Sequence, residues 1–292
     1  MRISTNQIFD SSVQSMDNSM AQVVQYQQQI STGQQYSKAS DNPYAVSWGV
    51  RLNFDKNRLT MYTNNQNAVS ASQDAASTQL GSMIDQMNQL TSISVQAQNG
   101  SLTPAALNAL YQQANQIYST IQGQATATDA SGNPIFPSSY TSVQIEPGVT
   151  VHSGVASADA FGKDLNTQGS TLVTGKTDVM ASIGAFVAYL GQKAGVPRQV
   201  SNDSLSTVSS GLSLAYNQLQ DAQTKSGLVG SLVTQASSAV NSLSTQLAST
   251  TSTLLDTDMA AATAGFTKEQ ALLNAAQNLF SKLQSSNLFS NL

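Results

Sequence analysis

A hydrophobic heptad repeat in the C-terminal third is the feature that most limits how this chain can fold. Apolar residues recur at alternating intervals of three and four over about seven heptads, with only two polar interruptions. This spacing places them on one stripe of a helix and is typical of coiled-coil packing. It predicts one long helix over residues 203–255, with Ser204 or Asp203 as the N-cap. The stripe comprises Leu205, Val208, Leu212, Ala215, Leu219, Ala222, Ser226, Val229, Val233, Ala236, Val240, Leu243, Leu247, Thr250 and Leu254.

The N-terminal half contains a counterpart with the same spacing and more polar interruptions. It predicts a second long helix that ends near QAQNGSLTP, where the pair Asn99-Gly100 supplies a left-handed stop. Thr103 is expected to cap a third helix, with Pro104 at its first position and an end near Gly123. The stripe of the second helix comprises Trp48, Leu52, Asp55, Leu59, Tyr62, Gln66, Val69, Gln73, Ala76, Leu80, Met83, Met87 and Leu90, and it assigns the only tryptophan to the core.

Both ends of the chain are periodic as well. Each carries too few charges for a helix that is solvated on all sides, so each is expected to need a partner that covers its apolar stripe. The N-terminal stripe comprises Phe9, Val13, Met16, Met20, Val23, Gln27 and Ile30. The C-terminal stripe comprises Met259, Ala262, Phe266, Leu273, Ala276, Phe280 and Leu283.

The middle of the chain has a different pattern. Residues 124–175 are rich in small and polar residues, and apolar residues alternate on both sides of Pro147-Gly148, which predicts a β-hairpin. A helix over about 177–193 is expected to return to the long helices. The predicted fold class is therefore mainly α, with long paired helices forming a coiled-coil rod and a small β-rich insert. We expect segments at 1–40, 41–123, 124–176, 177–200, 201–255 and 256–292.

The composition excludes several classes of protein. Only 10% of the residues are charged, compared with about 25% in a typical globular protein, and this favours side-by-side packing of like subunits. A net charge of −4 indicates neither a DNA-binding face nor an anchor to anionic membranes. The absence of cysteine removes disulfides and thiolate chemistry. No apolar run reaches the ~20 residues of a membrane helix, and no secretory signal peptide is recognisable.

Candidate catalytic residues are few and weakly supported. The single histidine, His152, lies in the predicted hairpin without a neighbouring carboxylate, so a surface strand position is expected. The sequence TGKTD at residues 174–178 lacks the glycine spacing and the preceding strand of a phosphate-binding loop. Asp256 and Asp258 are expected to begin a helix and not to form an acid–base pair. We expect no enzyme activity, no cofactor and no metal.

The stretch QISTGQQYSKASDNPYAV resembles the break after the N-terminal helix in the flagellin superfamily. There one helix ends at a glycine, a loop follows, and a Ser-Asp-Asp-Pro sequence starts the first long helix. Gly33 allows a left-handed stop, Ser40 or Asp41 is expected to cap the next helix, and Pro43 fits its first turn. This chain departs from the pattern at Gln34 and Gln35, where a basic pair is usual. The matching residues are Ile30, Ser31, Thr32, Gly33, Ser40, Asp41, Asn42 and Pro43.

Within that superfamily the chain most resembles the proteins of the hook–filament junction. It begins with MRIST, and a turn that resembles the family's follows the first long helix at Ala97, Asn99, Gly100 and Ser101 to Thr103. The end resembles junction-protein tails through Leu288, Phe289 and Leu292. The resemblance covers about residues 1–123 and 203–292, and it is loose in between.

The resemblance implies a structural role in the bacterial flagellum. The terminal segments would be disordered in the free monomer and would become helical on assembly. The implied partners are the preceding hook-associated protein, flagellin, further copies of this chain in a ring, and an export chaperone that covers the C-terminal stripe. The implied location is extracellular, after export without a cleavable signal peptide. The expected assembly interface comprises Phe9, Val13, Met16, Met20, Val23, Ile30, Met259, Phe266, Leu273, Phe280, Leu283, Leu288 and Phe289.

Two other interpretations stay open from the sequence. The chain could itself be flagellin, the bulk subunit of the filament, although its first and last residues favour the junction. It could also be a secreted coiled-coil adhesin or effector. That second alternative predicts ordered termini in a stable oligomer and does not explain the break between Gly33 and Pro43.

Overall fold

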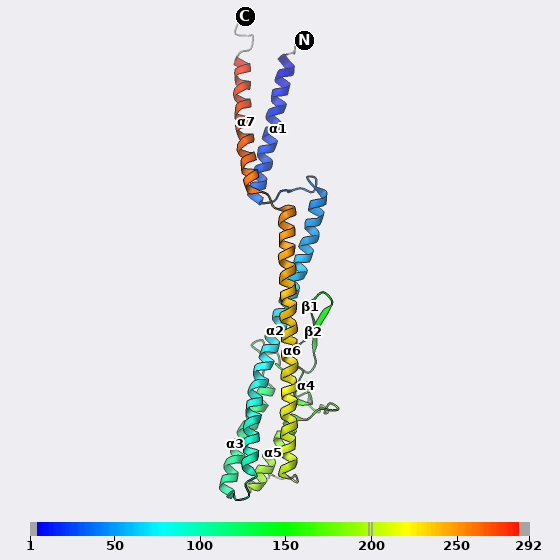
Figure 1. The fold of residues 1–292 in the computed structure, drawn as a ribbon, viewed down its shortest axis with the longest axis vertical. Helices are drawn as coiled ribbons and strands as arrows, with labels where there is room; N and C mark the ends of the chain where they lie inside the picture. The colour runs from blue at the N-terminus through cyan, green and yellow to red at the C-terminus, as the bar shows by residue number, and fades with distance from the viewer. Residues whose placement is uncertain (1–4, 198, 200, 286–292) are drawn as a thin grey trace. The chain divides into compact units, whose positions relative to one another are not determined.

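The computed structural model describes residues 5–197, 199 and 201–285 and confirms a mainly α fold. These residues form seven helices and one two-stranded sheet (Figure 1). The chain divides into two compact units, which we describe separately. The central unit comprises residues 59–242, and the terminal unit comprises residues 1–58 together with 243–292. Two long helices, α2 (Pro43–Ala97) and α6 (Leu205–Leu255), contribute residues to both units.

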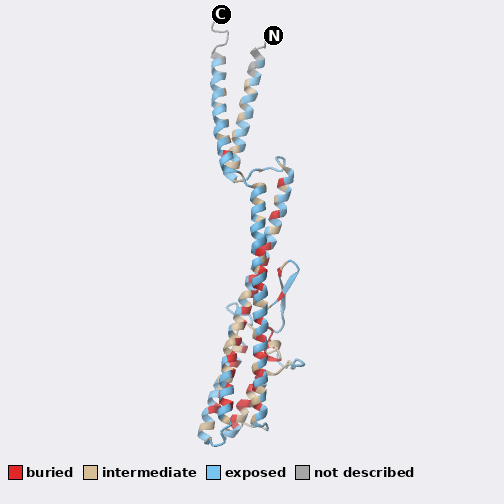
Figure 2. Ribbon diagram, in the orientation of Figure 1, coloured by how far each residue is buried: buried red, intermediate tan, exposed pale blue. Residues whose placement is uncertain are grey.

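The core of the central unit is a bundle of four helices. The inner faces of α2 and α6 enclose it together with α3 (Pro104–Ala125) and α5 (Val179–Lys193). Buried residues gather where these helices face one another (Figure 2). Four apolar residues of α5 follow the helical spacing seen in the sequence and are fully buried: Val179, Ile183, Phe186 and Leu190.

Within the central unit, α2 and α6 pack along the stripes that the heptad spacing predicts. Every predicted stripe residue of α2 from Leu59 to Leu90 is buried. The same holds for α6 from Val208 to Val240, except that Val229 is half-buried. The two helices are antiparallel, since Gln73 contacts Ser226 and, further along α2, Ser94 contacts Ser209. Long-range pairing of two heptad stripes is therefore confirmed.

The predicted β-hairpin is present and packs on this helix pair. Strands β1 (Thr141–Glu146) and β2 (Val149–Ser153) are antiparallel, with an irregular register near the turn. Ile145 and Val151 face α2 and α6 and form a small second core with residues of both helices. Two amide side chains of α2 hold β1 in place: Asn65 Nδ2 donates to Gln144 O at 2.7 Å, and Gln66 Nε2 donates to Ile145 O at 2.7 Å. A short helix, α4 (Ser157–Phe161), follows the hairpin and was not predicted.

The predicted caps are correct in α3 and α6 but not at the end of α2. Thr103 Oγ1 accepts a hydrogen bond from Ala106 N at 3.2 Å, and Ser204 Oγ accepts one from Thr207 N at 3.2 Å. Gly100 does not adopt a positive φ, so this glycine does not form the expected left-handed stop. The side chain of Asn99 closes the turn instead, because its Oδ1 accepts a hydrogen bond from Ser101 N at 3.1 Å. Helix α3 ends at Ala125, two residues later than expected.

The terminal unit contains a second helix pair. Helices α1 (Thr5–Thr32) and α7 (Met259–Ser285) lie side by side (Figure 1). The first turns of α2 and the end of α6 belong to the same unit. Trp48, which was expected in the core, is 39% exposed. The neighbouring residue Gly49 faces α6 instead. The side chain of Leu255 lies so close to Gly49 that a Cβ added there would be 2.7 Å from it.

Candidate assembly surface

The break after α1 is closed by a glycine in the left-handed conformation. Gly33 has a φ of 69°, and its N–H donates to Gln29 O at 2.8 Å, which satisfies one of the last free carbonyl groups of the helix. The hydroxyl groups of Ser31 and Thr32 turn back to Gln28 O at 3.0 and 2.8 Å. The predicted stop at Gly33 is confirmed.

This N-terminal break is hydrogen-bonded to the break between α6 and α7. Gln35 N donates to Leu255 O at 2.7 Å, and Thr257 N donates to Gly33 O at 2.9 Å. Gln34 and Asp256 face each other as an antiparallel bridge between these two bonds. We call residues 33–35 and 255–257 the paired break. It joins segments that lie more than two hundred residues apart, which local sequence patterns do not reveal.

Both helices that follow the paired break have a side-chain cap. Asn42 caps α2, because its Oδ1 accepts a hydrogen bond from Ala45 N at 3.1 Å, with Pro43 in the first position as predicted. The expected cap at Ser40 or Asp41 is wrong, and Asp41 instead accepts a hydrogen bond from Lys38 N within the loop. Asp258 caps α7 as predicted, accepting from Ala260 N and Ala261 N at 2.9 and 3.0 Å.

The facing sides of α1 and α7 carry much of the two predicted stripes. Ala262 is buried, and Gly265 lies against the ring of Tyr26, which would come within 2.5 Å of an added Cβ. Met20 and Gln27 were expected in the stripe but are exposed, and the residues just before them, Ser19 and Tyr26, are half-buried in their place. The half-buried stripe residues are Val13, Met16, Val23, Ile30, Phe266, Leu273, Ala276 and Phe280.

The helix pair leaves a second set of apolar side chains exposed to solvent. Met20 and Val24 lie one turn apart on α1, and Leu272 and Leu279 lie two turns apart on α7. Met259 at the start of α7 is also exposed. The side chains of Phe9 and Leu283 and the whole of Leu288 and Phe289 lie outside the described residues.

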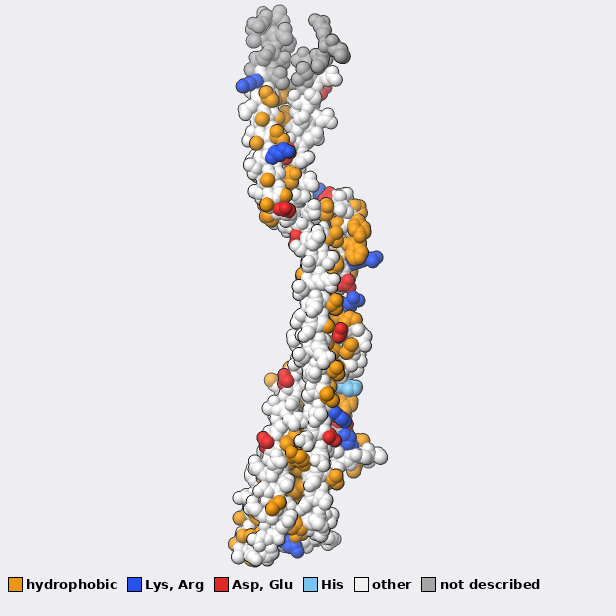
Figure 3. All heavy atoms as spheres, viewed as in Figure 1, with side chains coloured by type: hydrophobic (Ala, Val, Ile, Leu, Met, Phe, Trp, Pro, Cys, Tyr) orange, Lys and Arg blue, Asp and Glu red, His pale blue; other side chains and the backbone are white. Residues whose placement is uncertain are grey.

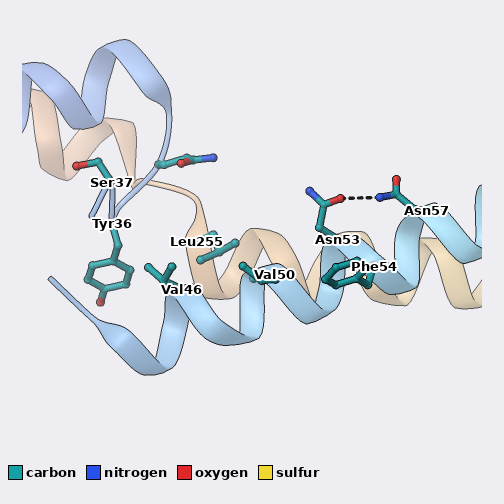
Figure 4. Close-up of a pocket in the computed structure, with 10 residues that line it drawn as sticks. Tyr36, Ser37, Val46, Val50, Asn53, Phe54, Asn57 and Leu255 are labelled. Carbon is teal, nitrogen blue, oxygen red and sulfur yellow. Dashed lines mark hydrogen bonds between the residues drawn. The ribbon is translucent and has the colours of Figure 1, made fainter. Parts of the chain in front are cut away.

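A groove beside the paired break was missed by the sequence analysis. Its volume is about 420 Å³, and Val46, Val50 and Phe54 of α2 form an apolar wall opposite the loop residues Tyr36 and Ser37 (Figure 4). Hydrophobic side chains gather on the surface over the start of α2 (Figure 3). The apolar wall could have been recognised in the sequence, since Val46, Val50 and Phe54 are spaced four residues apart and so lie on one face of the helix.

The residues considered as catalytic candidates outside the paired break have structural roles. His152 is exposed on β2 as predicted and stacks on Tyr140, with ring centroids 4.3 Å apart. In the TGKTD stretch, Asp178 caps α5 by accepting from Ala181 N at 2.9 Å, and Lys176 pairs with Asp159 at 3.6 Å. Among the described residues, no cluster of three or more His, Cys, Asp or Glu side chains is placed to hold a metal ion. None of the described helices combines the length and apolarity needed to span a bilayer.

Comparison with solved structures finds the same fold in flagellar proteins. A Vibrio parahaemolyticus protein described as flagellar hook-associated has 16% identity and a TM-score of 0.62, over 73% of this chain and 99% of that one. FlgL from Xanthomonas campestris has 16% identity and a TM-score of 0.54, over 67% and 98%. The flagellar junction protein FlgL from Legionella pneumophila has 11% identity and a TM-score of 0.52, over 72% and 100%.

Comparison with protein families gives a match at the level of sequence. The model of the bacterial flagellin N-terminal helical region matches residues 3–141, which include α1, α2 and α3. The model of the bacterial flagellin C-terminal helical region matches residues 210–292, which include most of α6 and all of α7. A search of curated protein sequences found no match. Since both helical regions are present in the same order and together take up most of its length, this chain belongs to the flagellin family.

Proposed function

We propose that this protein is a structural subunit of the bacterial flagellum that connects the hook-associated proteins to the flagellin filament. Membership of the flagellin family supports the flagellar role. The choice of the junction is supported by the fold, since the similar structures are described as hook-associated and junction proteins. It is also supported by the MRIST start and the LFSNL end of the sequence.

The observation that carries this proposal is the incomplete burial of the α1 and α7 stripes. Ala262 is the only buried residue among those side chains of the two helices that the structure describes. Most of the other described stripe residues are half-buried, and Met20, Val24, Met259, Leu272 and Leu279 are exposed. Two helices that cover each other so poorly gain little free energy from pairing, so further helices are needed to cover the rest.

Neighbouring subunits would supply that cover. Full burial of one leucine or phenylalanine side chain contributes roughly 1.5–3 kcal/mol, so several such side chains offset the entropy lost when a segment is ordered. Helix α1 carries only two charged residues, Asp10 and Asp17, which keeps repulsion between adjacent copies low. We propose that the pair is disordered in the free monomer and orders on assembly, with copies of the chain arranged in a ring.

The proposed place of the protein between hook and filament implies its partners. One face of the ring would contact the preceding hook-associated protein, and the other would receive flagellin. Before assembly, the C-terminal stripe would be covered by an export chaperone in the cytoplasm. The protein would then leave the cell through the flagellar export apparatus and act outside it as part of the flagellum.

Neighbouring residues in α1 and in α7 provide a matched test. Val13 and Leu273 are half-buried stripe residues, whereas Gln14 and Asn274 next to them are exposed. Cells that lack the native protein would receive Val13→Asp or Leu273→Asp, with Gln14→Asp and Asn274→Asp as controls. A charge on the stripe disfavours its burial between subunits, whereas the same charge on the outer face does not.

The measured quantities are the amount of exported protein and the number of filaments attached to hooks, counted by electron microscopy. We expect the stripe variants to be exported but to leave most hooks without filaments, and the controls to support normal filament numbers. Equal filament numbers for Val13→Asp and Gln14→Asp would contradict a role of the stripe in assembly.

A further inference from the structure

The connector between α2 and α3 contains an Asn-Gly pair in an unusual local arrangement. Asn99 and Gly100 are both exposed, and they lie between the last turn of α2 and the cap of α3. The backbone is held on both sides of Gly100: Asn99 N donates to Gln96 O at 3.1 Å, and Leu102 N donates to Asn99 O at 3.2 Å. The segment is thus ordered although it is accessible to water.

The Asn99 side chain folds over the Gly100 peptide. Its carbonyl oxygen, Oδ1, accepts a hydrogen bond from Ser101 N at 3.1 Å, which forms a local turn across Gly100. This bond withdraws electrons from the side-chain carbonyl carbon, Cγ, and makes that carbon a better electrophile. The N–H of Gly100 donates to no backbone carbonyl within the described residues, so its nitrogen is available to react.

From these contacts we infer that Asn99 is a site of spontaneous deamidation and isoaspartate formation. Hydroxide removes the proton from Gly100 N, and the nitrogen attacks Asn99 Cγ. A new N–Cγ bond closes a five-membered succinimide ring, the Cγ–Nδ2 bond breaks, and Nδ2 leaves as ammonia after taking a proton from water. The absence of a side chain on Gly100 leaves the approach to its nitrogen unobstructed.

Water then opens the ring at either of its two carbonyl carbons. Attack at Cγ breaks the bond between Cγ and Gly100 N and gives aspartate. Attack at the main-chain carbonyl carbon breaks the bond from that carbon to the nitrogen and gives isoaspartate, in which the main chain runs through Cβ and Cγ. Only water is consumed and only ammonia is released, so no oxidant, reductant or enzyme is required.

Conversion of Asn99 to aspartate or isoaspartate changes the connector next to residues that pack against the core. It adds a negative charge to a chain whose net charge is −4. The isoaspartate form also lengthens the main chain by one carbon next to Leu102, which is partly buried against the core of the central unit. Thr103, the cap of α3, follows directly. Deamidation is therefore expected to loosen the start of α3.

The test uses the purified full-length chain, incubated at neutral and at alkaline pH and sampled over time. An endoproteinase that cuts before aspartate releases residues 85–128, which contain three further asparagines in helices, Asn88, Asn108 and Asn115. Mass spectrometry of this peptide compares the four residues under identical conditions. Conversion of Asn99 to aspartate creates a new cleavage site, whereas isoaspartate gives the same mass change without cleavage.

Gly100→Ala is the matched variant, because an added Cβ at this position meets no atom within 4 Å and the backbone has no positive φ. We expect Asn99 to convert faster than each of the three helical asparagines, to convert faster still at alkaline pH, and to be slowed in Gly100→Ala. The assignment is overturned if Asn99 converts no faster than Asn88, Asn108 and Asn115, or if the alanine variant converts at the same rate.

Discussion

Gln73 and Ser226 are polar residues buried between α2 and α6. Ser226 Oγ donates to Gln73 Oε1 at 2.6 Å, and Gln73 Nε2 donates to the carbonyl groups of His152 and Gly154 at 3.1 and 3.2 Å. Gln73 thus uses both ends of its amide, one to contact α6 and the other to hold the end of β2 and the residue that follows it. A buried polar network of this kind fixes the register of the helices as well as the position of the hairpin.

Replacing Gln73 by leucine is expected to destabilise the central unit by roughly 2–4 kcal/mol, because the carbonyl groups of His152 and Gly154 lose their amide donor. Ser226 Oγ keeps only its longer hydrogen bond, at 3.2 Å, to the main-chain carbonyl of residue 73. Urea unfolding gives the free energy, with Gln89→Leu on the exposed face of α2 as the control. The double change Gln73→Leu with Ser226→Ala should cost less than the sum of the two single changes, since each single change already removes the hydrogen bond between the two side chains. An unfolding free energy equal to that of the control variant would contradict this account.

Asp164 follows α4 and is stabilised in its charged form. Burial raises the pKa of its carboxyl group, but hydrogen bonds from the Thr167 hydroxyl and from Asn166 N outweigh this, so the pKa lies below its ordinary value. The charged form then stabilises the fold at any pH above the unfolded pKa of about 3.9, and this contribution is lost as pH falls through the folded pKa.

Asp164→Asn is therefore expected to be less stable than the parent protein at neutral pH, and the difference should vanish in acid. The parent pKa can be read from the chemical shift of the carboxyl carbon during an NMR titration. Thermal unfolding of both proteins across the same pH range measures the stability difference. A difference that persists unchanged below the measured pKa would show that the charge of Asp164 is not its cause.

The aromatic ring of Tyr26 on α1 packs against Gly265 on α7, where a larger residue would have a side chain. The ring of Tyr26 occupies the space in which a Cβ on Gly265 would lie, at 2.5 Å. This close approach needs a glycine on α7, and it explains why Tyr26 and Ser19 face inward while Met20 faces outward. Pairing of α1 and α7 thus depends on one small residue near the start of α7.

Gly265→Leu is expected to displace the Tyr26 ring and separate the two helices, whereas Ala264→Leu on the exposed face next to it should not. Amide hydrogen exchange in α1 reports the difference, because helices that lose their partner exchange faster. Hydrogen exchange of the two variants should be compared in the assembled protein, because we propose that both helices are ordered there. Equal protection of α1 in the two variants would mean that Tyr26 does not hold the pair.

The long helices could be predicted from the sequence because their burial follows from local spacing. Leu59 to Leu90 of α2 were placed correctly even at the polar positions Gln66 and Gln73. Predictions failed where two neighbouring residues compete for one role, as with Asn42 and Asp41 at the cap of α2, or Gly49 and Trp48 beside Leu255. At Gly49 the outcome depends on a tertiary contact with Leu255, whereas at Asn42 it depends on which side chain reaches Ala45 N.

The paired break shows what local patterns do not contain. Gly33 and Asp258 could each be recognised as an end or a start of a helix, since stop and cap residues act within a few positions. The hydrogen bonds from Gln35 and Thr257 that join the two breaks link remote parts of the chain through backbone atoms. Every residue except proline has the same backbone N–H and C=O groups, so their pairing is not visible in the residue types.

At the scale of the whole molecule, the central unit contains the large buried core and the terminal unit contains the proposed assembly helices. Deleting residues 258–292 is therefore expected to leave the thermal unfolding of the central unit unchanged while abolishing incorporation into flagella. Limited proteolysis of the intact monomer should likewise trim both ends to a core of about residues 40–255. Loss of cooperative unfolding in the truncated protein, or resistance of both termini to protease, would contradict this division.

The most direct test of the junction role is reconstitution on isolated hooks that already carry the preceding hook-associated protein. The purified chain is added first, flagellin second, and growth is followed by electron microscopy. We predict that the chain alone adds only a short cap and that long filaments grow from the hooks when flagellin follows. If the chain alone grows into long filaments, it is the bulk subunit. If flagellin grows equally well without it, the chain is not the junction.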